Sequence, residues 1–225
     1  MLSKTDLRNA IASKNRGITA TPTDRQVIAS VIARVEDKNP TPEPLSAPEL
    51  LAGDWRLLYT TSKELLNIDK FPLATLGNIY QCVRPEKGRI YNIAELKSLP
   101  LCESLVSVVA SFTPADSDYP VAASGNSSDA ASSAETATAT LSKKRVNVAF
   151  NRAVIGLQRA LRYQSPSQYI DQLEANEKLS LLRGIDFAIN ADRQQGWLEI
   201  TYLDKDLRIG RGNQGSLFVL TKDSV

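Results

Sequence analysis

Histidine is absent from this sequence, which removes the commonest general base, the usual catalytic triads and most catalytic zinc sites. Carboxylate or cysteine chemistry remains. Asp204 and Asp206 are the only tight acidic pair near a recognisable motif, and two carboxylates can in principle share acid–base work. Alternate residues of a turn usually point into water, however, and the neighbouring Lys205 and Arg208 would keep both carboxylates ionised. We therefore expect a structural pair and predict no catalytic residue.

Arg208 and Arg211 offer a second kind of chemistry, because the planar arginine fork suits a lipid phosphate or diphosphate. We favour the alternative that they pair inside the fold, with Asp204, Asp206 or Trp55. The nearby glycines of GRGNQG, which include Gly212, do not follow a strand and open a helix. A phosphate-cradling loop is therefore not predicted here.

The two cysteines, Cys82 and Cys102, lie in or beside strand-like segments and have no histidine to accompany them. A metal site or a disulfide framework is therefore not expected. Free cysteine is among the most buried residue types, so we predict that each thiol is buried or half-buried. The sequence predicts no metal and no cofactor.

Charge and hydropathy limit the classes of partner that the protein is expected to bind. The chain carries 27 Lys and Arg against 25 Asp and Glu, a net charge of +2, which argues against a nucleic-acid partner and permits only mild attraction to anionic lipid. The N-terminus, MLSKTDLRNAIASK, has no apolar core of signal-peptide length. No window approaches the roughly 18 continuous apolar residues that cross a bilayer. Any membrane contact is therefore expected to be peripheral.

The elements that would position these side chains are mostly strands. Strand-like alternation occurs at 53–61, 77–83, 89–96, 105–113, 144–151 and 185–189, and the segment from 196 to 220 forms three further strands joined by two turns. Eight or nine antiparallel strands are enough to close a barrel that holds one small ligand. The alternation places these residues on the inward face: Trp55, Leu57, Tyr59, Val146, Val148, Phe150, Leu198, Ile200 and Tyr202.

Helices are predicted at the N-terminus. Ser3 with Asp6 and Thr23 with Gln26 make two capping-box-like starts, and the second precedes an apolar stripe at helical spacing. We divide the chain into a helical segment at 1–39, a stiff Pro-rich connector at 40–52 and a barrel domain at 53–225. Residues 115–140 are rich in Ala, Ser and Thr, bury little apolar surface, and are expected to form a mobile insertion.

An apolar segment follows the first strand and carries Leu65, Leu66 and Ile68. It could be a lid over a ligand entrance or a plug that belongs to the core. We favour the plug, because exposing several large apolar side chains is costly unless a partner covers them.

Four blocks of sequence carry a resemblance to a known family: Asn15 to Gly17, Gly53 to Ser62, Gly77 to Cys82 and Tyr202 to Leu220. Together they resemble the plastid-lipid-associated proteins, also called fibrillins. The Gly-x-Trp start at Gly53 also resembles the entry to a lipocalin barrel, where a tryptophan plugs the closed end and an arginine stacks over it. Arg208 and Arg211 are the candidates for that arginine. The block that matches the family most specifically contains Asp204, Asp206, Arg208, Arg211 and Gly212.

The resemblance implies a mainly β fold, a lipocalin-like antiparallel β-barrel with an N-terminal α-helical segment. It also implies a non-enzymatic protein that binds or carries a carotenoid, prenyl-quinone or other lipid at thylakoid membranes or lipid globules, in photoprotection or membrane maintenance. The resemblance also implies a peripheral protein that is associated with thylakoids or lies in the stroma or cytoplasm. The main alternative is an interaction module with a solid barrel that docks a prenyl-quinone biosynthetic enzyme or another thylakoid partner.

Overall fold

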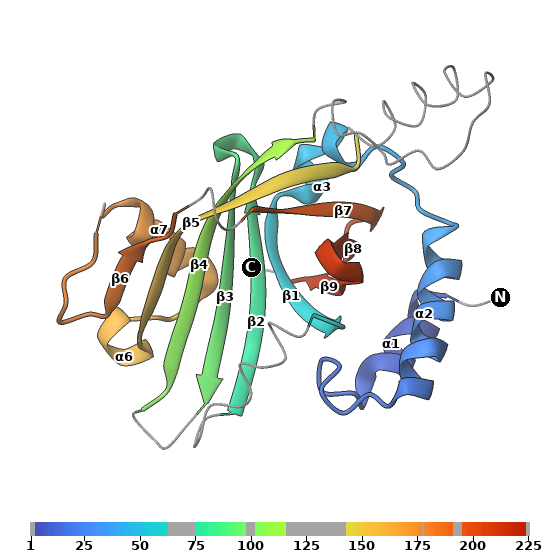
Figure 1. Ribbon diagram of the computed structural model, residues 1–225, viewed down its shortest axis with the longest axis horizontal. Coiled ribbons are helices and arrows are strands. Elements are labelled where there is room, and N and C mark those ends of the chain that lie inside the picture. The colour runs from blue at the N-terminus through green and yellow to red at the C-terminus, as the bar shows by residue number, and fades with distance from the viewer. Residues whose placement is uncertain are drawn as a thin grey trace.

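The computed structural model describes residues 3–62, 75–97, 102–115, 143–176, 178–190 and 195–223. Figure 1 shows a curved wall of long strands, with two helices along one side of the molecule and a second pair of helices at the opposite end. The predicted lid residues Leu65, Leu66 and Ile68 lie outside the described residues. So does the predicted insertion at 115–140, except for Ala115.

Two capped helices form the N-terminal segment. Helix α1 spans Lys4–Ala12 and begins at the predicted capping box of Ser3 and Asp6. Helix α2 spans Pro22–Glu36, but its capping box is Thr21 with Asp24, so the predicted box at Thr23 is wrong. Pro22 explains the earlier start, because proline fits the first helical position, where no backbone N–H is needed.

The connector is less extended than predicted. A 3-10 helix, η1, spans Pro44–Ser46, and a short helix, α3, spans Pro48–Leu51. Both begin with a proline at the first helical position, so the prolines that predicted a stiff, extended chain start helical turns instead.

The described residues form nine antiparallel strands after the connector, and eight of these close into a barrel. Pairing runs β4-β3-β2-β1-β9-β8-β7-β5, and β5 pairs back to β4 to complete the ring. Strand β6 pairs only with the second half of β5, beyond the barrel. The mainly β fold with an antiparallel barrel and an N-terminal helical segment is therefore confirmed. The strands are β1 Gly53–Thr60, β2 Thr75–Arg84, β3 Arg89–Lys97, β4 Ser104–Pro114, β5 Arg145–Leu157, β6 Ile185–Ala188, β7 Gln195–Leu203, β8 Leu207–Gly212 and β9 Leu217–Lys222.

Short helical elements join some of these strands. The predicted hairpin turn after β2 is the 3-10 helix η3, Pro85–Lys87, and Gly88 closes it with a φ of 57°. Helices α6, Gln158–Leu161, and α7, Pro166–Glu174, follow β5. The 3-10 helix η5, Asn213–Gly215, joins β8 to β9.

Apolar side chains of the described residues gather in three clusters. The first fills part of the barrel interior and includes Trp55 and Leu57. The second lies between the barrel wall and helices α1 and α2, and the third between the wall and helices α6 and α7. Both faces of the sheet are therefore covered by apolar side chains over much of their length. For this reason few positions along the strands carry polar residues.

Candidate functional site

The barrel interior is the candidate ligand site, and seven of the nine residues predicted to line it belong to the interior cluster. Six are buried there, and Phe150 packs against them half-buried. The six are Trp55, Leu57, Val146, Val148, Leu198 and Ile200. Alternation along parts of β1, β5 and β7 brings these side chains together from strands that are far apart in the sequence.

Tyr59 and Tyr202 belong instead to the cluster beneath helices α1 and α2. Each follows an irregularity in the strand register, between Leu57 and Tyr59 in β1 and between Ile200 and Tyr202 in β7. An extra residue in one strand reverses the faces of all side chains after it. The predicted inward position of these two tyrosines is therefore wrong.

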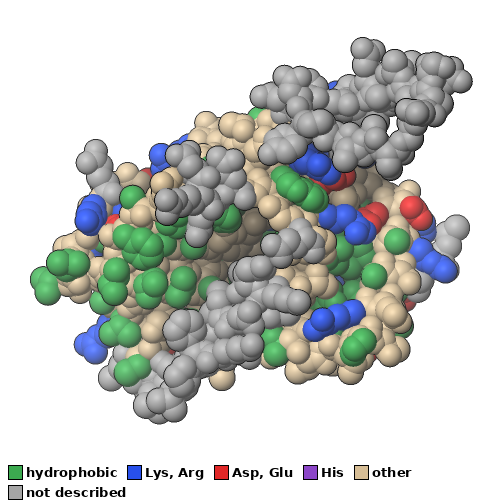
Figure 2. Space-filling view, viewed as in Figure 1, with side chains coloured by type: hydrophobic (Ala, Val, Ile, Leu, Met, Phe, Trp, Pro, Cys, Tyr) green, Lys and Arg blue, Asp and Glu red, His purple; other side chains and the backbone are tan. Residues whose placement is uncertain are grey.

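The interior is not completely filled by the side chains that face it. Several large residues of the interior cluster remain half-buried, whereas a barrel packed solid would cover them. They are Val106, Phe112, Phe150 and Phe218. Figure 2 shows this face of the molecule hollowed near its centre. The inward face therefore borders open space, and its lining is apolar.

Trp55 packs in this interior cluster next to helix α3. Its ring is fully buried, and Nε1 donates a hydrogen bond of 2.8 Å to the carbonyl oxygen of Leu51. The guanidinium carbon of Arg208 lies 5.0 Å from the ring centroid, and Nζ of Lys222 lies 5.2 Å from it. The predicted stacking of an arginine on Trp55 is confirmed for Arg208. Burial lowers the pKa of Arg208 to about 9, so its charge persists at neutral pH.

Arg211 has a different partner. Its guanidinium donates to both carboxylate oxygens of Glu36 at the end of α2, with N–O distances of 2.6 and 3.1 Å. It therefore fastens a helix to the outside of the barrel. Gly212 is buried on the same strand, where an added Cβ would lie 3.2 Å from the Phe218 ring.

Two interior polar residues were missed by sequence reasoning. Gln81 lies between the inward-facing Ile79 and Val83 of β2, and Asn92 lies two residues after Ile90 of β3. Arg208 donates to Oε1 of Gln81, and Nε2 of Gln81 donates to Oδ1 of Asn92 over 3.1 Å. The period of two along each strand could have revealed both as polar residues on an apolar face.

The acidic pair of the second-last turn anchors helix α1. Asp204 accepts from Nζ of Lys4 at 2.8 Å and from the hydroxyl of Tyr202 at 2.6 Å, and Asp206 accepts from Arg8 at 2.8 Å. Burial alone would raise the pKa of Asp204, but these hydrogen bonds outweigh it and hold the pKa well below its usual range. Both carboxylates face helix α1, which supports their structural assignment.

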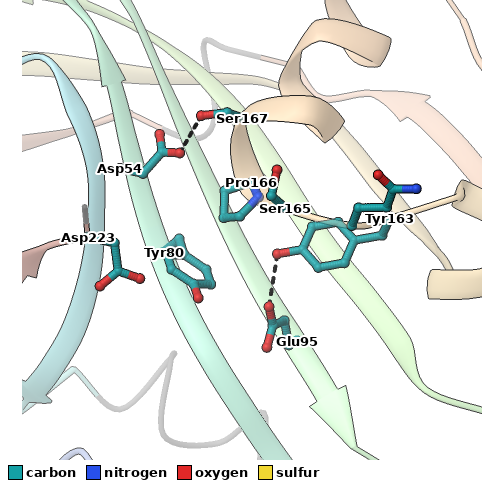
Figure 3. A pocket seen from close by; sticks show the side chains of 9 residues that line it. Asp54, Tyr80, Glu95, Tyr163, Ser165, Pro166, Ser167 and Asp223 are labelled. Atoms are coloured by element: carbon teal, nitrogen blue, oxygen red, sulfur yellow. Dashed lines mark hydrogen bonds between the residues drawn. The ribbon is translucent and has the colours of Figure 1, made fainter. Parts of the chain in front are cut away.

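A polar pocket of about 260 Å³ lies outside the barrel, against the start of α7 (Figure 3). Asp54 accepts from Ser167 at 2.6 Å and pairs with Arg84 at 2.8 Å, while Tyr163 donates to Glu95 at 2.9 Å. Burial raises the pKa of Tyr163, so this hydroxyl stays protonated. The carboxylates already have partners within the fold, so the pocket holds helix α7 on the barrel.

The cysteines differ in their surroundings. Cys82 is fully buried, and burial raises the pKa of its thiol. Cys102 is exposed, so the prediction of a buried or half-buried thiol is wrong for it, because it precedes β4 in a connection and not in the sheet. Within the described ranges, no three His, Cys, Asp or Glu side chains gather as a metal site.

An exposed apolar patch lies beside the barrel, around β6. Six of the seven exposed large apolar side chains among the described residues belong to it, and Leu181 and Leu182 are 86% and 94% exposed. The other members are Ile155, Leu157, Ile185 and Phe187. Figure 2 shows apolar side chains gathered at the end of the molecule where Figure 1 places β6. We call this set the β5–β6 patch. Every described helix is too short or too polar to cross a membrane.

Comparisons with known proteins agree along nearly the whole chain. The family model PAP_fibrillin matches residues 1–119 and 120–221. A probable plastid-lipid-associated protein 2 of Arabidopsis thaliana is 29% identical over 98% of this chain and 70% of its own length. A chromoplast-specific carotenoid-associated protein of Cucumis sativus is 28% identical over 98% and 67%. Plastoglobulin-1 of Pisum sativum is 31% identical over 98% and 60%. No solved structure matches the chain.

Proposed function

Because this chain belongs to the plastid-lipid-associated protein family, the fibrillins, we propose that it binds or carries a hydrophobic small molecule inside its barrel without catalysing a reaction. The observation that carries the proposal is the apolar interior that its own side chains leave incompletely filled. Similarity to a carotenoid-associated protein and to a plastoglobulin favours a carotenoid, a prenyl-quinone or another lipid as the ligand.

A ligand of this class must be long enough to offset the cost of association. Each buried methylene contributes about 0.8 kcal/mol, and the loss of translational and rotational freedom costs roughly 4 to 15 kcal/mol. About ten to twenty buried carbons are therefore needed for measurable affinity. Prenyl and acyl chains fall in this range, whereas smaller apolar molecules do not.

We propose that the protein works at a lipid surface, at thylakoid membranes or lipid globules, in photoprotection or membrane maintenance. The β5–β6 patch supports a peripheral lipid contact, because contiguous exposed apolar surface on a soluble domain marks a place of contact. The apolar segment with Leu65, Leu66 and Ile68 remains a proposed lid or plug of the same barrel.

Filling the interior tests the proposal. Val106 is a half-buried member of the interior cluster on β4, and Ser111 is an exposed residue of the same strand. We expect Val106→Phe to weaken saturable binding of a prenyl-quinone or carotenoid at least tenfold, because the larger ring occupies the ligand's space. Ser111→Phe should leave binding unchanged. Circular dichroism of both variants checks that the barrel remains folded.

Mass spectrometry of an organic extract of the purified protein gives the direct readout. A co-purified isoprenoid or acyl lipid in wild type, reduced in Val106→Phe, is the expected result. An empty extract, together with no saturable binding of any added isoprenoid, would overturn the carrier proposal. The alternative proposed from the sequence, an interaction module with a solid barrel that docks a protein partner, would then describe the protein better.

A further inference from the structure

The polar residues inside the barrel form one connected chain. Arg208 comes from β8, Gln81 from β2 and Asn92 from β3. Gln81 and Asn92 each lie between apolar inward residues of their strands. Leu207 and Ile209, on either side of Arg208, belong to the outer cluster beneath the N-terminal helices. Alternation therefore directs the Arg208 guanidinium into the barrel, where it lies over Trp55.

The direction of this hydrogen-bond chain is fixed by chemistry. A guanidinium has donors and no acceptor, so Gln81 must receive the Arg208 N–H at its amide oxygen. The amide nitrogen of Gln81 then donates to Oδ1 of Asn92. Asn92 is consequently left with its Nδ2 amino group, which carries two N–H donors, as the free end of the chain. None of the described residues accepts from this group.

The surroundings of the Trp55 ring are also electropositive. Arg208 and Lys222 both lie within about 5 Å of the Trp55 ring centre, and neither forms an ion pair among the described residues. A positive charge at one end of a hydrogen-bond chain polarises the amides that follow it, which makes the terminal N–H groups better donors. Among the described residues, Lys222 Nζ donates to the Leu50 carbonyl over 3.0 Å, whereas the polarised Asn92 amino group meets no acceptor.

We propose that the Arg208–Gln81–Asn92 chain binds the head of the ligand, and that this head carries an acceptor oxygen such as a quinone carbonyl or a carboxylate. The apolar tail would lie along the half-buried side chains of β4 and β5, which include Val106 and Phe150. This inference rests on the proposed function and narrows it: a pure hydrocarbon would leave the Asn92 donors buried without a partner.

A matched pair of probes tests the chemistry of the head. A prenyl-1,4-benzoquinone and the prenylbenzene of equal chain length have rings of similar size, but only the quinone carries carbonyl oxygens that accept hydrogen bonds. We expect wild-type protein to bind the quinone at least tenfold more tightly, measured by displacement of one fluorescent lipid probe, because sites built to donate hydrogen bonds reject analogues that lack the acceptor. The bound quinone's carbonyl stretch should shift to lower frequency in the infrared spectrum.

Asn92→Leu removes the terminal donors while keeping the side-chain size. It should lower the tenfold preference for the quinone, leave prenylbenzene affinity unchanged and reduce the infrared shift, because only the freed N–H of Gln81 remains in place of the two donors on Asn92. The control is Asn78→Leu, which removes an amide that donates to Glu95 at the outer pocket and should keep the preference. Unchanged prenylbenzene binding also shows that Asn92→Leu is folded.

The outcomes separate this inference from the proposed function. If wild type binds both probes equally, or if Asn92→Leu keeps the tenfold preference, the headgroup assignment is overturned while the carrier function stands. If neither probe displaces the lipid reporter, the carrier function itself fails and the headgroup assignment with it.

Discussion

At the residue scale, Trp55 joins three parts of the molecule. It packs in the interior cluster, donates to the connector at Leu51, and lies beneath the charge of Arg208. The ring is fully buried, so little can rearrange to replace it. We therefore expect substitution of Trp55 to be among the more damaging single changes.

We expect Trp55→Ala to destabilise the domain by about 3 to 5 kcal/mol, the usual cost of removing a buried aromatic side chain. Urea denaturation measures it. A double-mutant cycle with Arg208→Met should give a coupling of about 0.5 kcal/mol or more if the cation–π contact stabilises the fold. Strict additivity would contradict that contact. Arg211→Ala, which breaks a partly exposed pair with Glu36, serves as the control and should cost about 1 kcal/mol or less.

Gly17 is a second sensitive position. Its φ is 107°, and an added Cβ would lie 2.2 Å from the carbonyl oxygen of Thr60, which belongs to the backbone and cannot move away cheaply. The loop that contains Gly17 also pairs with β1, because the N–H of Thr60 donates to the carbonyl oxygen of Arg16 over 2.9 Å.

Gly17→Ala should therefore lower stability by at least about 2 kcal/mol, combining backbone strain with a steric clash. Thermal unfolding followed by circular dichroism measures the loss. Gly215 also has a positive φ, 71°, but an added Cβ there meets nothing within 4 Å. Gly215→Ala should cost clearly less, and equal losses would show that the close approach at Gly17 is unimportant.

At the element scale, helix α1 is held by charge. Lys4 and Arg8 meet Asp204 and Asp206 in the turn between β7 and β8. Because the folded-state pKa of Asp204 lies below its unfolded value, its contribution to stability is complete above about pH 4 and is lost as pH falls further.

Lowering the pH from 5 to 2 should consequently reduce the urea midpoint of wild type. Asp204→Asn should already be less stable at pH 5, by about 2 kcal/mol for the lost charged hydrogen bonds, and should lose less on acidification. Asp37→Asn, at an exposed carboxylate after α2, is the control and should follow wild type. If the urea midpoints of Asp204→Asn and wild type fall by the same amount on acidification, Asp204 is not the titrating group.

The β5–β6 patch gives a prediction about lipid contact. Leu181→Asp with Leu182→Asp should reduce flotation with thylakoid-lipid vesicles several-fold, because two charges replace the most exposed apolar side chains. Stability should change by less than about 0.5 kcal/mol, since both side chains are almost fully exposed. Val27→Asp alters the large apolar residue outside the patch that is exposed among the described ones, 53% exposed on α2, and should float like wild type. Normal flotation of the double variant would place lipid contact elsewhere.

Sequence patterns predicted where the strands lie better than they predicted which face of the sheet each side chain occupies. Alternation identified β1, β5 and β7 and seven inward residues correctly, because a period of two follows directly from strand geometry. It failed at Tyr59 and Tyr202, because a register irregularity depends on the partner strand, which one strand's sequence does not contain. Gln81 and Asn92 were missed for a related reason. Their role as a hydrogen-bonded chain depends on Arg208, which lies on another strand.

At the scale of the whole molecule, the barrel depends little on its longest connection. Pro114 pairs with Val146, and the N–H of Ala115 bonds to the carbonyl of Arg145 at 2.9 Å. The ends of the β4–β5 connection are therefore already adjacent, and a short turn can join them.

Replacing residues 117–140 with a short Gly/Ser linker should shift the Tm by less than about 3 °C, the change that roughly 1 kcal/mol produces in a domain of this size. Ala115 is kept because it is buried. Calorimetry of the two proteins measures the shift. A larger fall in Tm would show that the replaced segment packs on the barrel.

The pairing of β1 with β9 also has a consequence for the order of events during synthesis. Leu57 and Leu220 are neighbours in the ring, although almost the whole barrel domain separates them along the chain. While a ribosome is still translating the intervening strands, β1 has one open edge, and the ring cannot close until the last strand emerges. The nascent barrel is thus a sheet with exposed edges for most of its translation, and chaperones would find it most accessible at that stage.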